Sequence, residues 1–254
     1  MATLNEGRIE PAPEIVAEAR RWLDAVRPAL GAEFVAAYMY GSVLTRSFDF
    51  RRSRVNVLVV ARNLSRLELL DQIAAAIPDP RKPPRVEAMF VTRIQIERSL
   101  DSFAIEWLDI QERHLRLDGE DVFGGLEIPR ESLRLQLEHE LRGKHIQLRQ
   151  AYLLGRPAER ARLLALASSS FAALFRTLLR LNGETPPADN GRVVERLAEI
   201  YELNAQGLLG AHLQRVGGKA EATVTHERFQ RFLTEIERLI DAIDVARAER
   251  SGRI

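Results

Sequence analysis

The chain of 254 residues contains no cysteine. This absence excludes disulfide bonds, thiolate metal sites and a cysteine nucleophile, and it is compatible with a reducing compartment. The sequence also lacks any stretch that approaches the ~20 apolar residues of a membrane-spanning helix. Its first residues show neither the basic segment nor the apolar core of a signal peptide. We therefore expect a cytoplasmic protein that has no membrane partner.

Neither sign of charge predominates in the composition. The 37 Lys and Arg residues are balanced by 36 Asp and Glu residues, which gives a formal net charge of +1. This balance argues against nucleic acid as a partner, although it leaves room for local basic patches. With 46% hydrophobic and 29% charged residues, the chain has the composition of a globular protein that folds without outside help.

The first half of the chain alternates between helical and extended patterns. Apolar residues recur at helical spacing from Ile15 to Leu30, which predicts an amphipathic helix ending near Pro28 and Gly31. Short runs rich in β-branched and aromatic residues follow, and they predict strands. We expect strands at residues 34–40, 55–60, 86–91 and 103–110, and a helix at residues 64–77. The continuous apolar run at 55–60 is typical of a strand buried on both faces.

The composition changes after Asp118. The turn-rich stretch GEDVFGGLEIP leads into a region where helical periods dominate and strand character is almost absent. We expect helices at about 131–154, 158–181, 190–202, 205–216 and 225–247, whose broad apolar stripes are typical of a bundle core. The sequence therefore predicts an α+β chain with two domains. Residues 1–128 would form an α/β domain with a mixed sheet and flanking helices, and residues 129–254 an all-α helical bundle.

The most informative segment runs from Tyr40 to Val60 and reads YGSVLTRSFDFRRSRVNVLVV. It begins with Gly41 and Ser42 at the end of an expected strand. Ten residues lie between Ser42 and Ser53, and the positions just before the next apolar run hold Arg54 and Asn56. This arrangement resembles the nucleotidyltransferase superfamily, which includes DNA polymerase beta and the kanamycin and streptomycin adenylyltransferases. In that superfamily, a Gly-Ser pair and a loop of similar length precede Asp-hydrophobic-Asp on an apolar strand.

The resemblance implies that domain 1–128 is nucleotidyltransferase-like and that the helical tail is similar to that of aminoglycoside nucleotidyltransferases. Nucleotidyl transfer requires Mg²⁺, which prefers carboxylate ligands. Two acids at i and i+2 on a strand suit that need, because their side chains project from the same face. Arg54 and Asn56 occupy those positions here. A guanidinium repels a dication and a neutral amide is a weak ligand, so we expect no metal site at these two residues.

Two carboxylates remain as candidates for a catalytic role. The resemblance places a third acid on the next long strand, where Glu87 matches, and Glu106 is a second candidate. One interpretation is structural: Arg54 and Glu87 form an ion pair that fills the space of the metal. The other is functional: Arg54 and other arginines of the same loop contact the phosphates of a nucleotide or another anion without a metal. The residues of this expected anion site are Gly41, Ser42, Arg46, Arg51, Arg52 and Arg54.

Three functions are compatible with the sequence, and whether the protein is an enzyme stays open. The first is a catalytically degenerate nucleotidyltransferase-fold protein that binds a nucleotide, another anion or a protein partner in a regulatory role. The second is an active transferase that recruits Mg²⁺, its one implied cofactor, through Glu87, Glu106 or Asp49. In the third, the first domain is structural and the helical bundle acts as an interaction module. Such a bundle could also form a homodimer.

Overall fold

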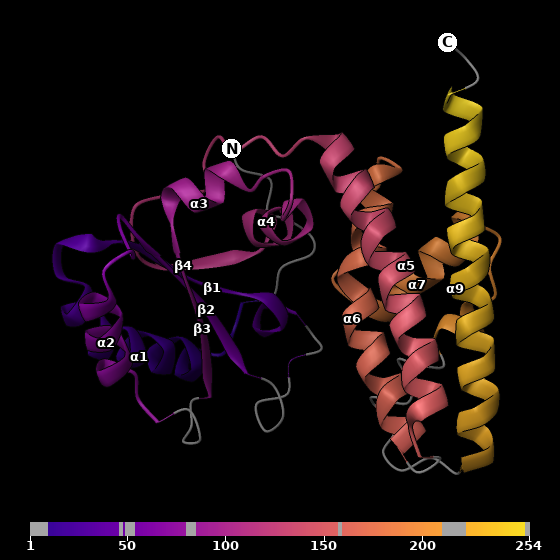
Figure 1. Cartoon of the computed structure of the whole chain (residues 1–254), viewed down its shortest axis with the longest axis horizontal. Coiled ribbons are helices and arrows are strands. Elements are labelled where there is room, and N and C mark those ends of the chain that lie inside the picture. The colour runs from indigo at the N-terminus through magenta and orange to yellow at the C-terminus, as the bar shows by residue number, and fades with distance from the viewer. Residues whose placement is uncertain are drawn as a thin grey trace. The chain divides into compact units, whose positions relative to one another are not determined.

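The computed structural model describes residues 10–45, 48, 54–79, 85–156, 159–209 and 222–251 (Figure 1). The chain divides into two compact units, Met1–Ser132 and Leu133–Ile254. The first unit combines a mixed sheet with helices. The second consists of helices in the part that the structure describes. No helix of the described ranges is both long enough and apolar enough to cross a membrane.

The sheet of the first unit contains β1 (Phe34–Tyr40), β2 (Val55–Ala61), β3 (Val86–Thr92) and β4 (His114–Gly119). Its strand order is β3-β2-β1-β4. The central strand β1 pairs antiparallel with β2 and β4, whereas β2 pairs parallel with β3. The strands expected at 34–40, 55–60 and 86–91 are thus confirmed. The apolar run of β2 is almost completely buried, as its lack of alternation indicates.

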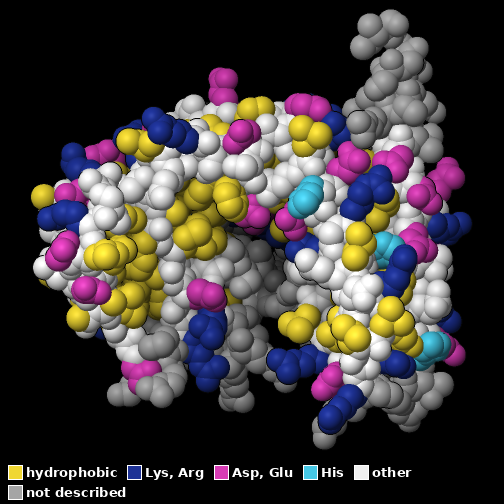
Figure 2. Space-filling view, viewed as in Figure 1, with side chains coloured by type: hydrophobic (Ala, Val, Ile, Leu, Met, Phe, Trp, Pro, Cys, Tyr) yellow, Lys and Arg dark blue, Asp and Glu magenta, His cyan; other side chains and the backbone are white. Residues whose placement is uncertain are grey.

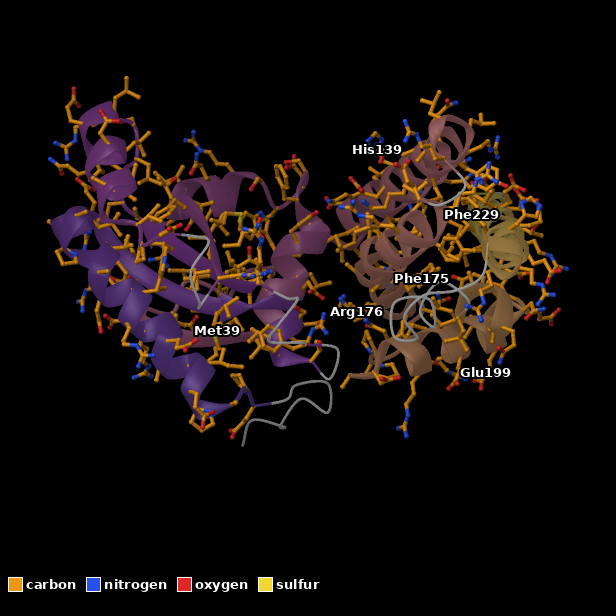
Figure 3. The ribbon with its side chains drawn as sticks, turned by 90° about the horizontal axis from the view of Figure 1, so that it is seen from below. Met39, His139, Phe175, Arg176, Glu199 and Phe229 are labelled. Atoms are coloured by element: carbon orange, nitrogen blue, oxygen red, sulfur yellow. The ribbon has the colours of Figure 1, made fainter. Side chains whose placement is uncertain are left out.

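Two apolar layers enclose this sheet. Helices α1 (Pro13–Leu30) and α2 (Leu67–Ala76) cover one face, where Trp22 and Val26 pack in the same core as Met39, which is labelled in Figure 3. On the other face lie α3 (Arg93–Arg98) and α4 (Ala104–Glu112). Trp107 of α4 packs there in one core with Tyr38. Both faces of the sheet are thus covered by helices, and the ends of its strands are positioned between these two layers.

The expected fourth strand at 103–110 is wrong, because these residues form most of α4. Ala104, Trp107 and Ile110 are buried at intervals of three residues, a spacing that fits one face of a helix. The fourth strand is β4 instead. The Tyr38 hydroxyl fixes the chain that follows β4: it donates to the Glu120 carbonyl oxygen at 2.5 Å and accepts from the Val122 amide at 2.8 Å.

The second unit contains α5 (Arg130–Leu154, which begins in the first unit), α6 (Arg160–Leu181), α7 (Asn190–Ile200) and α9 (Ala222–Ser251). Residues 205–209 are also helical, and the remainder of the helix expected at 205–216 lies outside the described residues. These helices share an apolar core, in which Phe171 of α6 meets Phe232 of α9 edge to face at 5.4 Å between ring centroids.

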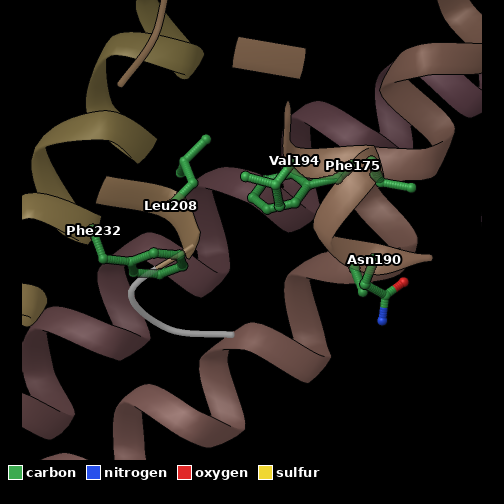
Figure 4. Close-up of a pocket in the computed structure, with 7 residues that line it drawn as sticks. Phe175, Asn190, Val194, Leu208 and Phe232 are labelled. Atoms are coloured by element: carbon green, nitrogen blue, oxygen red, sulfur yellow. The ribbon is translucent and has the colours of Figure 1, made fainter. Parts of the chain in front are cut away.

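A small cavity interrupts the core of the second unit (Figure 4). Phe175, Val194, Leu208 and Phe232 are among the side chains that line it. Its volume is about 10 Å³. Such a volume holds one water molecule at most, so the cavity is a packing void and offers no room for a ligand.

Candidate functional site

The turn at Gly41 and Ser42 follows directly from the end of β1. Residues Gly41–Leu44 form a single 3-10 turn, which the Thr45 amide and hydroxyl close by donating to the Ser42 carbonyl oxygen at 2.9 and 2.8 Å. This single turn is too short to build the macrodipole with which a longer α-helix attracts an anion.

Three residues on neighbouring strands form a row beside this turn. The β1–β2 register pairs Tyr40 with Asn56, and the β2–β3 register pairs Asn56 with Glu87. Directly paired residues project from the same face of a sheet. Gly41 has φ +82°, and a Cβ at this position would stand 2.9 Å from the Asn56 side-chain nitrogen. Asn56, the position within β2 where the resemblance places an acid, therefore carries an amide that packs against the Gly-Ser turn.

Arg54 and Glu87 form the ion pair that the structural interpretation of the sequence proposes. Arg54 Nε lies 3.7 Å from Glu87 Oε2, and the two side chains are 56% and 64% exposed. An ion pair between two exposed side chains stabilises a fold by at most ~1 kcal/mol, because water screens the charges. The guanidinium of Arg54 is thus neutralised by Glu87 without being buried by it, and it remains accessible to another anion.

The hydroxyl of Tyr40 is influenced by the charge of Glu87 in the same row. Burial and, to a smaller extent, the negative charge of Glu87 raise the pKa of the Tyr40 hydroxyl. The phenol is therefore neutral at pH 7 and can donate a hydrogen bond. Sequence reasoning assigned Tyr40 no role, although its position at the strand end immediately before Gly41 was a usable signal.

His114 was also missed as a neighbour of the site, because its strand was missed. It starts β4 and pairs with Tyr40 on the side of β1 opposite Asn56. Its Nδ1 lies 2.8 Å from the Ile110 carbonyl oxygen, and its ring meets Tyr38 edge to face at 4.9 Å between centroids. These contacts orient the imidazole at the end of the row.

Glu106, a predicted site residue, is not part of this row. It is exposed in the first turn of α4, so it does not lie on the strand expected at 103–110. Four more predicted residues of the loop, Arg46, Asp49, Arg51 and Arg52, fall outside the described residues. Across the ranges that the structure describes, no three His, Cys, Asp or Glu side chains gather in a group that could hold a metal ion.

Comparisons with known proteins identify the fold. No family model matches the chain, and no curated protein matches it in sequence. Among solved structures, it is similar to spectinomycin adenyltransferase AAD(9) from Enterococcus faecialis, whose crystal structure contains ATP and spectinomycin. The TM-score is 0.51 with 16% sequence identity, and the match covers 87% of this chain and 98% of that chain. At this identity the similarity shows the fold alone, and we conclude that the chain has a nucleotidyltransferase-like fold.

Proposed function

We propose that this protein is a catalytically degenerate member of the nucleotidyltransferase fold. It binds a nucleotide or a similar anion in a regulatory role and does so without a divalent metal. The observation that carries the proposal is the exposed guanidinium of Arg54, which stands beside Asn56 where the resemblance places two metal-binding acids.

The charge of the row supports a loss of catalysis. Nucleotidyl transfer needs Mg²⁺ to neutralise the triphosphate and align the attacking oxygen. Arg54 contributes a positive charge, and the Asn56 amide packs against Gly41. Glu87, the carboxylate of the row, already faces Arg54. A dication bound here would either displace the Arg54 guanidinium or lie in contact with it. Repulsion between the two positive charges makes such a contact unfavourable.

The same features favour a phosphate. Arginine presents a planar fork of donors that matches phosphate oxygens, and a charge-assisted hydrogen bond is stronger than a neutral one. A phosphate competes with an exposed and therefore weak ion pair when it approaches Arg54. Tyr40, whose phenol is neutral, is a second donor at the same strand ends. Because the similar spectinomycin adenyltransferase contains ATP in its crystal structure, ATP is the ligand to test first.

An active transferase is the second candidate function. It would recruit Mg²⁺ through Glu87, Glu106 or Asp49 and transfer a nucleoside monophosphate to a small molecule or a protein. Its support is Glu87, which lies on β3 directly beside Asn56. Glu106 gives the active transferase less support. It lies on helix α4 and not on a strand, where positions i and i+2 would hold two carboxylates on the same face.

Calorimetric titration with ATP, GTP and CTP, each with Mg²⁺ and with a chelator, separates the functions. Pyrophosphate release is followed in the same samples. We expect binding of at least one nucleotide in the presence of the chelator and no pyrophosphate. Binding that requires Mg²⁺, together with pyrophosphate release, would establish the active transferase. If no nucleotide binds, the first unit is structural and the helical unit, proposed as a bundle, is the interaction module.

A further inference from the structure

The sheet of the first unit ends in two edge strands, β3 and β4, which differ in how they are protected. The pairing of β4 with β1 has a register shift between Ala37 and Tyr38, and β4 carries the charged residues Arg116 and Asp118. Irregular pairing and charged side chains discourage the addition of another strand. Strand β3 pairs with β2 in regular register over its whole length and contains neither Pro nor Gly. Its outer edge is therefore suited to pairing with a further strand.

The register decides which backbone groups of β3 face this outer edge. The Val55 amide of β2 donates to the Arg85 carbonyl oxygen at 3.0 Å, so the carbonyl group of Arg85 points toward β2. Along a strand, the N–H and C=O groups of successive residues point alternately to the two neighbouring strands. The odd-numbered residues of β3 thus bond to β2, and the even-numbered residues face outward. These outward residues are Val86, Ala88, Phe90 and Thr92.

The outward series is limited at both ends. The Thr92 amide donates to Gln95 Oε1 at 2.8 Å in the capping box of α3, so this donor is occupied. At the other end, the preceding even-numbered residue is Pro84, which has no N–H group. No residue of the described ranges bonds to the outward groups of Val86, Ala88 and Phe90. These three residues therefore offer their donors and acceptors to a further strand.

The side chains beside this edge are apolar on both faces of the sheet. Ala88 and Phe90 are partly exposed and pack against the core on the side of α1 and α2. Met89 and Val91 are partly exposed and pack against the core on the side of α3 and α4. Figure 2 shows that hydrophobic side chains cover a broad area of the first unit. A strand added to β3 would extend both apolar layers and remove apolar surface from water.

The outward groups form a set that is complementary to itself. Val86 and Phe90 lie at equal distances along the strand from Ala88, so a two-fold axis at Ala88 matches every donor with an acceptor of an antiparallel copy. Ala88 then pairs with Ala88 of the other copy, and Val86 pairs with Phe90. An aromatic residue opposite a β-branched residue is a favourable cross-strand pair. Shifting the register by two residues in either direction would place Ala88 opposite Thr92 or Pro84, whose N–H group is occupied or missing.

The charges beside the edge do not oppose this arrangement. In the same register, Glu87 lies opposite Met89 of the other copy, so no two like charges meet directly. The two Glu87 residues are diagonal neighbours at roughly 7–8 Å. Each faces its own Arg54 at 3.7 Å, which reduces the repulsion between them.

We propose that β3 pairs antiparallel with β3 of a second copy of the chain, with the two-fold axis at Ala88, so that the two sheets become continuous. Such an interface is isologous, because the same surface contributes from both copies. The match of all open donors and acceptors within the same three residues favours a second copy over an unrelated strand. The inference does not depend on whether the row of Tyr40, Asn56 and Glu87 binds an anion.

Sedimentation equilibrium of the full chain over a range of concentrations tests the proposal, and we expect a dimer. Ala88→Pro removes the donor at the two-fold axis from both copies. Two hydrogen bonds are then lost, so the dimer dissociation constant should rise about 10- to 100-fold. The fold should survive, because proline is tolerated on an edge strand where its nitrogen faces away from the sheet. Ala88→Ser keeps the N–H group and is the matched control, which should dimerise like the native chain.

A cysteine at the axis tests the register in a chain that has no other cysteine. Directly opposite, hydrogen-bonded residues of antiparallel strands have Cα atoms about 5.5 Å apart, which is within the range of a disulfide bond. Ala88→Cys should therefore form a disulfide-linked dimer under mild oxidation. Leu67→Cys is the control, because Leu67 is 71% exposed on α2, and it should cross-link much more slowly.

Circular dichroism and thermal melting establish that each variant is folded. A native chain that is monomeric at every concentration would overturn the proposal, as would a folded Ala88→Pro variant with the native dissociation constant. If Ala88→Pro does not fold, the cysteine variants decide. Equal rates of cross-linking for Ala88→Cys and Leu67→Cys would exclude the two-fold axis at Ala88.

Discussion

The replacement Arg54→Gln removes the positive charge that we assign to anion binding while retaining a polar side chain. Hydrogen bonds to charged groups contribute about 1.5–3 kcal/mol, so loss of the guanidinium should weaken nucleotide binding about 10- to 100-fold. The effect on folding should be much smaller. The ion pair with Glu87 joins two side chains that are both more than half exposed, at 3.7 Å, and is worth at most ~1 kcal/mol.

The assay is a calorimetric titration with ATP in the presence of a chelator, accompanied by a thermal melt of each protein. Arg62→Gln is the matched control: Arg62 is an exposed arginine that directly follows β2 at its other end. We expect this control to bind ATP with native affinity. Equal dissociation constants for the native protein and Arg54→Gln would refute the assignment, and equal losses in both variants would show that only net charge matters.

Three further predictions concern the strand row, the Gly-Ser turn and the second unit. The double variant R54D/N56D should gain a Mn²⁺ site that calorimetry detects, because carboxylates at i and i+2 project from the same face; unchanged metal affinity would contradict the placement of these residues. In chemical denaturation, Gly41→Ala should lower the free energy of unfolding by about 1–2 kcal/mol, because a residue with a Cβ is strained at φ +82°. It should lower that free energy further because the added Cβ would contact the Asn56 side chain. Gly125→Ala is the control for strain alone, because Gly125 has φ +77° and an added Cβ would meet open space. If both variants lose the same free energy of unfolding, the contact with Asn56 makes no contribution. Burial lowers the pKa of His145, so the unfolded chain binds that proton more readily. Stability should consequently fall as the pH drops through about 6.5 and level off below the folded pKa, and denaturation of His145→Gln should show a shallower pH dependence.

The elements that the sequence predicted correctly are those with a long, uniform pattern. The apolar run of β2 and the helical period of α1 leave little choice of structure. The prediction of a strand at 103–110 was wrong because Ile105 and Trp107 are residue types that favour strands. The buried positions of this segment follow a helical spacing. Strand β4 was not predicted because only two of its residues, Leu115 and Leu117, show the apolar alternation that is typical of a strand. Pairing with β1 stabilises it, and a tertiary contact of that kind is not visible in a local pattern.

The approach of Arg54 and Glu87 was predictable from the resemblance, which places an acid at Glu87 on the next long strand after the one that Arg54 precedes. The parallel pairing of β2 with β3 brings the two residues together, and no strand pairing was predicted from the sequence. The contact between the Asn56 amide and Gly41 was not predictable, because it depends on the backbone of a 3-10 turn. The same holds for the raised pKa of Tyr40, which results mainly from burial that only the packed fold provides.

The most direct test of the central claim is a crystal structure of the native protein grown with ATP and Mn²⁺, with anomalous diffraction used to locate the metal. We expect phosphate oxygens within hydrogen-bonding distance of the Arg54 guanidinium and no manganese peak between Arg54, Asn56 and Glu87. A manganese ion coordinated by Glu87 and bridging to the phosphates at that place would contradict the claim that the site works without a metal.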